Sequence, residues 1–80
     1  MTRIDQFKNR VNLTRLAYES GANYSMMYHD ARATALLTAM TPDEVMLVDE
    51  ETFLIYDFID DIVLRMLDRE EIQLDEEAVS

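Results

Sequence analysis

Hydrophobic residues recur at three- and four-residue steps through the first part of the chain, and this spacing is the period of an amphipathic helix. The repeat predicts a first helix at about 3–19. Thr2 is suited to cap its start, and Ser20-Gly21 is suited to end it, because glycine readily takes the left-handed conformation that closes a helix. The residues of the repeat are Ile4, Phe7, Val11, Thr14 and Tyr18.

A second helix is predicted at about 24–39, with Asn23 or Ser25 as its N-cap. Four residues, three of them alanines, recur along it at four-residue steps. A ridge of small residues lets another helix approach closely, so we expect this ridge to be the contact face of the second helix. The ridge consists of Met27, Ala31, Ala35 and Ala39.

The stretch "TPDE" is the clearest local signal of a helix start in the chain. Thr41 is a typical N-cap, Pro42 suits the first helical position, and Glu44 is placed to complete a capping box. A third helix is therefore predicted to begin at Pro42.

The helical pattern then continues to about residue 71, either as one long helix or as two. Asp49 offers a second cap with acidic residues directly after it, where the helix dipole favours negative charge. We therefore expect a short helix at 42–48, a break near Val48, and a long helix at 50–70.

Turn-forming residues are scarce, because the 80 residues include one glycine and one proline. Strands joined by tight turns need more of both. The expected fold is therefore all-α, a small helical bundle of three to four helices. Residues 1–71 are expected to form a single domain, and residues 72–80 a frayed, disordered acidic tail, because they hold too little apolar material to pack.

The long helix combines an acidic line with an apolar core side. At about 100° per residue, four carboxylates fall within roughly 20° of one line. These are Glu50, Asp57, Asp61 and Asp68. The opposite side is the predicted core, flanked by Phe58 and Leu67, and it consists of Ile55, Ile59, Ile62, Val63 and Met66.

Apolar residues also lie beside the acidic line. Leu54 and Leu64 project within about 40° of it, and Phe53 is close by. A helix that is apolar nearly all round is central in its fold or covered by a partner, and exposed apolar residues rimmed by charge are a common form of binding site. The alternative to a binding site is that these leucines have no function at the surface, because single exposed leucines are normal in proteins.

The charge is unevenly distributed along the chain, with a net charge of −10. Residues 1–40 hold five basic and three acidic residues, a balance of +2, whereas residues 41–80 hold two basic and fourteen acidic residues, a balance of −12. An acidic half repels nucleic acid and membrane phosphates and attracts basic proteins. The basic residues of the first helix are expected to meet acids of the second half. Solubility alone is the alternative reason for the charge.

Residues for catalysis, cofactor binding or metal binding are not expected in this chain. Cysteine is absent, and the one histidine, His29, has sequence neighbours that point away from it on a helix. Gly21 stands alone, so there is no glycine-rich phosphate loop. Calcium loops of the EF-hand type and di-iron bundles need patterns that the acids at 57–61 do not supply. The protein is therefore not expected to be an enzyme.

The expected location is cytoplasmic, in a reducing compartment. The chain has no cysteine, no recognisable signal peptide and no apolar run near the roughly 20 residues of a membrane span.

A protein-interaction module is the function that these patterns favour. We expect an acidic helical inhibitor or adaptor that docks on a basic protein, because a row of carboxylates on a helix can imitate the phosphate backbone of nucleic acid. In composition and size the chain resembles small acidic virus-encoded proteins that block nucleases. The alternative is a homodimeric or larger structural or assembly-chaperone subunit. The predicted partner-binding residues are Glu50, Phe53, Leu54, Asp57, Asp60, Asp61, Leu64 and Asp68.

Overall fold

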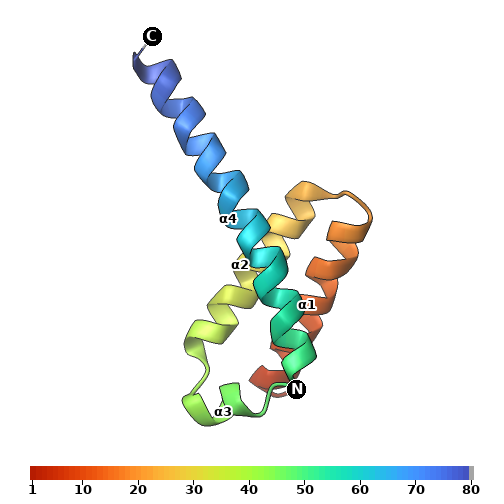
Figure 1. Ribbon diagram of the computed structural model, residues 1–80. Coiled ribbons are helices and arrows are strands. Elements are labelled where there is room, and N and C mark those ends of the chain that lie inside the picture. The colour runs from red at the N-terminus through yellow and green to blue at the C-terminus, as the bar shows by residue number, and fades with distance from the viewer. Residues whose placement is uncertain (80) are drawn as a thin grey trace.

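Four helices form the part of the chain that the structure describes. This computed structural model describes the backbone of residues 1–79 and the side chains of residues 1–68. The helices are α1 (Arg3–Glu19), α2 (Asn23–Ala39), α3 (Pro42–Met46) and α4 (Glu50–Val79), and residues 1–79 contain no strand (Figure 1). The predicted all-α bundle is confirmed. Within residues 1–79, none of the helices has both the length and the apolar character that crossing a membrane requires.

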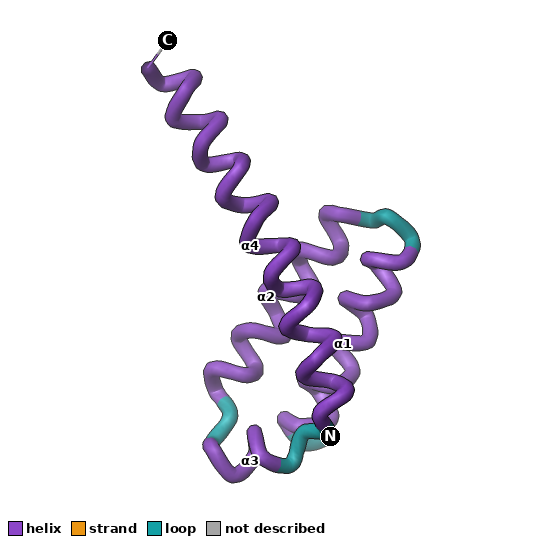
Figure 2. The backbone as a smooth tube through the Cα atoms, viewed as in Figure 1, coloured by secondary structure: helices purple, strands orange, loops and turns teal. Residues whose placement is uncertain are grey.

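The first two helices form an antiparallel hairpin, and α4 packs against both of them. Figure 2 shows α1 and α2 joined by a short turn, with α3 at the opposite end leading the chain back into α4. The C-terminal part of α4 extends beyond the hairpin (Figure 1). The molecule is consequently elongated, with principal extents of 49 × 27 × 19 Å.

Side-chain caps mark three of the predicted helix starts. The Thr2 hydroxyl accepts a hydrogen bond from the backbone N–H of Asp5 at 3.1 Å. Thr41 and Glu44 form the complete capping box, with hydrogen bonds of 3.0 and 3.2 Å. Asp49 accepts from the backbone N–H of Thr52 at 3.0 Å and so begins α4. The predicted break between the third and fourth helices is therefore confirmed.

Two predicted boundaries before α4 differ from the structure. The N-cap of α2 is Ala22, without a side-chain hydrogen bond, and not Asn23 or Ser25. The tight turn that ends α1 at Gly21, whose φ is 74°, leads directly into α2 and leaves no extended residue at those positions. α3 ends at Met46, because the next residues close the turn that brings Val48 into the core.

The fourth helix continues past its predicted end at residue 70 and reaches Val79. The reason is local, since residues 71–79 include glutamates, glutamine, leucine and alanine, which favour helices, and no glycine or proline. The expected disordered acidic tail at 72–80 falls on residues whose side chains lie outside the described ones, as does all of Ser80. It stays a prediction.

The core lies where α4 covers the α1–α2 hairpin. Phe7 is fully buried at its centre, with its ring centroid 5.4 Å from that of Tyr56 and 5.7 Å from that of Phe53. One apolar cluster surrounds Phe7, and a second one lies nearer the α1–α2 turn. The buried members of the second cluster are Ala17, Met26, Ile59 and Val63.

The predicted contact face of α2 is wrong. Ala31, Ala35 and Ala39 are exposed to solvent. The side that packs into the bundle instead carries Met26, Asp30 and Ala33 as its buried residues. An aspartate in the middle of this stripe makes it look polar in the sequence, and the alanine ridge is the more regular apolar pattern on the same helix.

Candidate protein-binding surface

The four carboxylates of the predicted acidic line are all exposed on the side of α4 that faces away from the hairpin. Their spacing of seven, four and seven residues places them above one another along a helix with 3.6 residues per turn. We refer to Glu50, Asp57, Asp61 and Asp68 as the acidic line.

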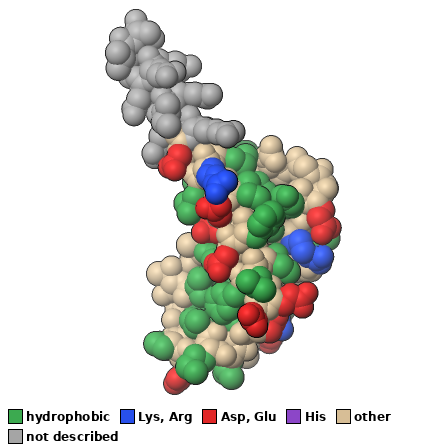
Figure 3. All heavy atoms as spheres, in the orientation of Figure 1, with side chains coloured by type: hydrophobic (Ala, Val, Ile, Leu, Met, Phe, Trp, Pro, Cys, Tyr) green, Lys and Arg blue, Asp and Glu red, His purple; other side chains and the backbone are tan. Residues whose placement is uncertain are grey.

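Large apolar side chains lie beside the acidic line. Leu54 is 61% exposed, Phe58 58% and Leu64 52%. Figure 3 shows hydrophobic and acidic side chains next to one another on the face of the molecule that α4 forms. We call these three residues together with the acidic line the outer face of α4.

Phe58 belongs to this surface and was not among the predicted partner-binding residues. Its angle on the helix predicts a position at the edge of the core. The structure places it over the end of α1, where its ring meets the ring of Tyr18 edge-on at 5.8 Å between centroids. Tyr18 is itself 41% exposed. The apolar part of the outer face therefore continues onto α1, and the helical angle alone does not reveal this.

Two of the predicted partner-binding residues are turned toward the bundle. Phe53 is partly buried and packs against the core around Phe7. Asp60 is partly buried and lies beside Asp30 of α2. The other six are exposed and share the outer face of α4.

Two basic residues of α1 contact acids from the second half of the chain, and these acids lie outside the acidic line. The guanidinium of Arg3 is 3.5 Å from the Glu44 carboxylate, and Nζ of Lys8 is 3.2 Å from the Asp49 carboxylate. The expected pairing between the two halves of the chain is thus present within one molecule. Hydrogen bonds from Thr52, with a further contribution from Lys8, lower the pKa of Asp49 to about 2.

The outer face therefore keeps an excess of negative charge. Arg65 of α4 forms an ion pair with this face, because its Nη2 lies 3.0 Å from the Asp61 carboxylate one turn away. Both side chains are well exposed, so this pair contributes little to stability. Within residues 1–68, neither Glu50 nor Asp57 forms an ion pair.

A pair of carboxyl groups lies behind this surface, between α2 and α4. Asp30 is 3% exposed, and its Oδ1 has no hydrogen-bond partner among the described residues. Burial raises the pKa of Asp30 to about 8, with further contributions from a side-chain hydrogen bond to Asp60 and from its negative charge. One proton shared by the two groups allows the hydrogen bond and removes one of two like charges.

A hydroxyl pair borders these carboxyl groups. Thr34 Oγ1 and the Tyr56 hydroxyl are 2.7 Å apart. Burial, opposed by this hydrogen bond, raises the pKa of Tyr56, and the nearby carboxylates raise it further. The sequence holds one signal for the burial of Asp30, because Asp30 lies on the same helical side as Met26 and Ala33, but it holds none for the pairing with Asp60.

Features of a metal centre or a catalytic relay do not come together in the described residues. No group of three or more His, Cys, Asp or Glu side chains within residues 1–68 is arranged to hold a metal ion. His29 is partly buried and has Arg10 Nη1 at 3.0 Å from its Nδ1. Since a guanidinium is always a donor, Nδ1 accepts, and the imidazole is not oriented by a carboxylate as a general base is in a triad.

The structure thus defines the class of protein as a small all-α bundle with a mixed apolar and acidic helix face. Comparisons with protein-family models, with curated proteins and with solved structures gave no match for this chain. Its function therefore has to be inferred from its own residues.

Proposed function

We propose that this protein is a non-enzymatic interaction module that docks the outer face of α4 onto a basic surface of another protein. The observation that carries the proposal is the exposure of Leu54, Phe58 and Leu64 beside a line of carboxylates. Exposed apolar residues rimmed by charge are typical of protein-binding sites.

The apolar residues and the carboxylates of the outer face have different roles in such a complex. Apolar and aromatic anchors at the centre of an interface supply most of the binding energy when they enter pockets of the partner. Carboxylates around them steer a positively charged partner and raise the association rate, an effect that salt screens. Because α4 presents most of this surface and is packed on the hairpin, little conformational entropy is lost on binding.

The class of partner is proposed from the arrangement of the charges in one row. A straight row of carboxylates on a rigid helix imitates the repeated negative charges of a nucleic-acid backbone, so the partners proposed are basic proteins that bind nucleic acid. Occupying their binding surface makes this protein an inhibitor, and bridging them to another molecule makes it an adaptor. Direct nucleic-acid binding is disfavoured by the charge of the outer face.

Charge reversal on the outer face tests the proposal. We expect Asp57→Lys/Asp61→Lys to lose partners that the wild-type protein captures from a cell extract, as identified by mass spectrometry. The control is Asp5→Lys/Asp43→Lys, which makes the same change of charge at exposed acids away from this face. Captured proteins should be basic, and their capture should weaken as the salt concentration rises.

Circular dichroism of each variant shows whether the helices are retained. Equal capture by the wild type and the Asp57/Asp61 variant, with helicity retained, contradicts the proposal. Equal loss from the control variant also contradicts it, because overall charge rather than the outer face of α4 would then determine binding.

A self-associating structural or assembly-chaperone subunit is the second candidate. The same observation favours it, since three large apolar side chains on one helix face offer a surface for a second copy of the chain.

A further inference from the structure

Two arginines differ from the other basic residues of this protein. Four of the six Lys and Arg side chains in residues 1–68 form ion pairs. The other two side chains, Arg10 and Arg32, have no acidic partner within residues 1–68. Both line one groove between α1 and α2. In a protein with seventeen acidic residues, two unpaired guanidiniums in a single groove indicate a place for an external anion.

Neutral groups hold both guanidiniums. Arg10 Nη1 lies 3.0 Å from Nδ1 of His29. The guanidinium carbon of Arg32 lies 5.8 Å from the centre of the Tyr28 ring. Since a guanidinium has five N–H donors, these contacts orient each side chain and leave most donors available to a ligand.

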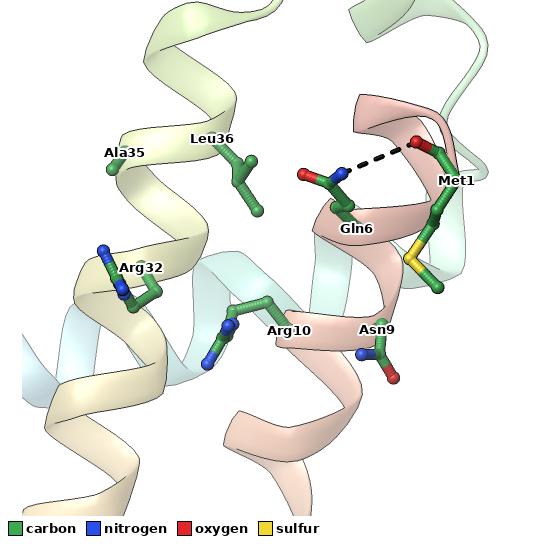
Figure 4. A pocket seen from close by; sticks show the side chains of 7 residues that line it. All are labelled: Met1, Gln6, Asn9, Arg10, Arg32, Ala35 and Leu36. Carbon is green, nitrogen blue, oxygen red and sulfur yellow. Dashed lines mark hydrogen bonds between the residues drawn. The ribbon is translucent and has the colours of Figure 1, made fainter.

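The rest of the groove combines amide and apolar groups. Gln6 and Asn9 contribute amides from α1, and Leu36 and Ala35 contribute apolar surface from α2. The groove has a volume of about 420 Å³, within the range of sites for small molecules. In Figure 4, Arg10 extends from α1 toward the helix that carries Arg32, and α4 passes behind the two helices.

The position of the groove lessens the repulsion between an anionic ligand and the acidic residues of α4. It opens on the side of the hairpin away from α4, so the helices α1 and α2 stand between it and the acidic line (Figure 4). Exposed charges separated by more than about 10 Å are largely screened at 0.1 M salt. The described residues that line the groove include two arginines and no acidic residue.

We propose that this groove binds an oxyanion, a carboxylate or phosphate group, carried on a small ligand with an apolar part. The planar fork of a guanidinium matches either group with two parallel hydrogen bonds. Two arginines from different helices then hold the oxyanion between them, and Leu36 and Ala35 contact the apolar part. This site is separate from the outer face of α4 and does not depend on the function proposed for it.

Titration of ¹⁵N-labelled protein with benzoate and with phenyl phosphate tests this site by NMR. We expect shifts of the amide signals of residues lining the groove, and the tighter probe identifies the preferred oxyanion. Phenol is the neutral control probe. Arg10→Gln and Arg32→Gln should each weaken binding at least about tenfold, whereas Arg65→Gln, on α4, should leave it unchanged.

Arg10→Lys and Arg32→Lys keep the positive charge but remove the planar guanidinium. They are used if circular dichroism shows that a glutamine variant has lost helicity. They are expected to weaken binding as well. The proposal is overturned if neither probe shifts the signals of the groove. It is also overturned if phenol shifts them equally, or if Arg65→Gln weakens binding as much as the substitutions in the groove.

Discussion

Asp30 shows how a single residue links the packing of this protein to pH. Its carboxyl group is buried against α4, next to Asp60, and holds a proton up to a pH of about 8. An ordinary aspartate releases that proton near pH 3.8, as the unfolded chain does. Folding therefore takes up a proton between these two values, and the stability contributed by Asp30 is complete below pH 3.8 and declines as the pH rises toward 8.

The other groups with shifted pKa values change their contributions outside the window from pH 5 to 8. Glu44 and Asp49 have pKa values lowered by their hydrogen bonds, so their contributions to stability change at more acidic pH. Tyr56 has its pKa raised above 10, so its contribution changes at more alkaline pH.

We predict that the wild-type protein loses free energy of unfolding from pH 5 to pH 8, by up to about 1.4 kcal/mol per pH unit. Asp30→Asn should flatten this dependence and be more stable than the wild type at pH 8, because an amide can donate a hydrogen bond to Asp60 and carries no charge. Urea unfolding followed by circular dichroism at several pH values measures both effects. Asp57→Asn, at an exposed position, is the control, and identical slopes for Asp30→Asn and wild type would contradict this role.

At the scale of the elements, helix ends rather than helix interiors determine where the chain changes direction. The capping box at Thr41 and the cap at Asp49 start two helices that are separated by only three residues. The turn between α1 and α2 depends on Gly21, whose φ of 74° lies in the left-handed region. No atom lies within 4 Å of the place a Cβ would occupy there, so backbone conformation is the sole reason for glycine.

Gly21→Ala should therefore lower the free energy of unfolding by about 1 kcal/mol. Gly21→Asn should lower it by less, because asparagine tolerates the left-handed conformation better than alanine does. Urea unfolding of the two variants measures the difference. Ala22→Gly, one residue further along, is the matched control for a change in chain flexibility. A stability of Gly21→Ala equal to wild type would show that the turn can take another conformation.

At the scale of the whole molecule, charge is separated between two faces. The outer face of α4 is acidic, and the groove behind the α1–α2 hairpin is lined by Arg10 and Arg32. The interior between these faces is small, with Phe7, Met26 and Ile59 as its largest fully buried side chains. The surface proposed for a basic partner and the groove proposed for an anion therefore lie on different faces, and neither proposal depends on the other.

The charge of the outer face also bears on self-association. A symmetric dimer brings the same patch of both copies together, which places carboxylates of the acidic line in one copy near those of the other. We therefore predict a monomer at micromolar concentration and low salt in sedimentation velocity, with weak association only when high salt screens this repulsion. A dimer at low salt that Leu54→Glu dissociates would instead favour the structural-subunit alternative, with Glu19→Gln as an exposed control on α1.

Local sequence was sufficient to predict the helices, because their signals act within a few residues. Thr2, Gly21, Thr41 and Asp49 mark the helix boundaries through hydrogen bonds or backbone conformation of near neighbours. The spacing of the acidic line follows in the same way from the helical period. These features of the candidate surface were therefore predictable without knowing what packs against α4.

Only the tertiary structure decided which side of each helix is covered, and over which part of its length. Phe53 and Leu64 lie at nearly the same angle on α4, yet Phe53 reaches the ring of Phe7 and Leu64 remains exposed. Periodicity shows which side chains share a face, whereas burial depends on neighbours that come from distant parts of the chain. For the same reason, neither the buried pair of Asp30 with Asp60 nor the shared groove of Arg10 and Arg32 was predictable from the sequence.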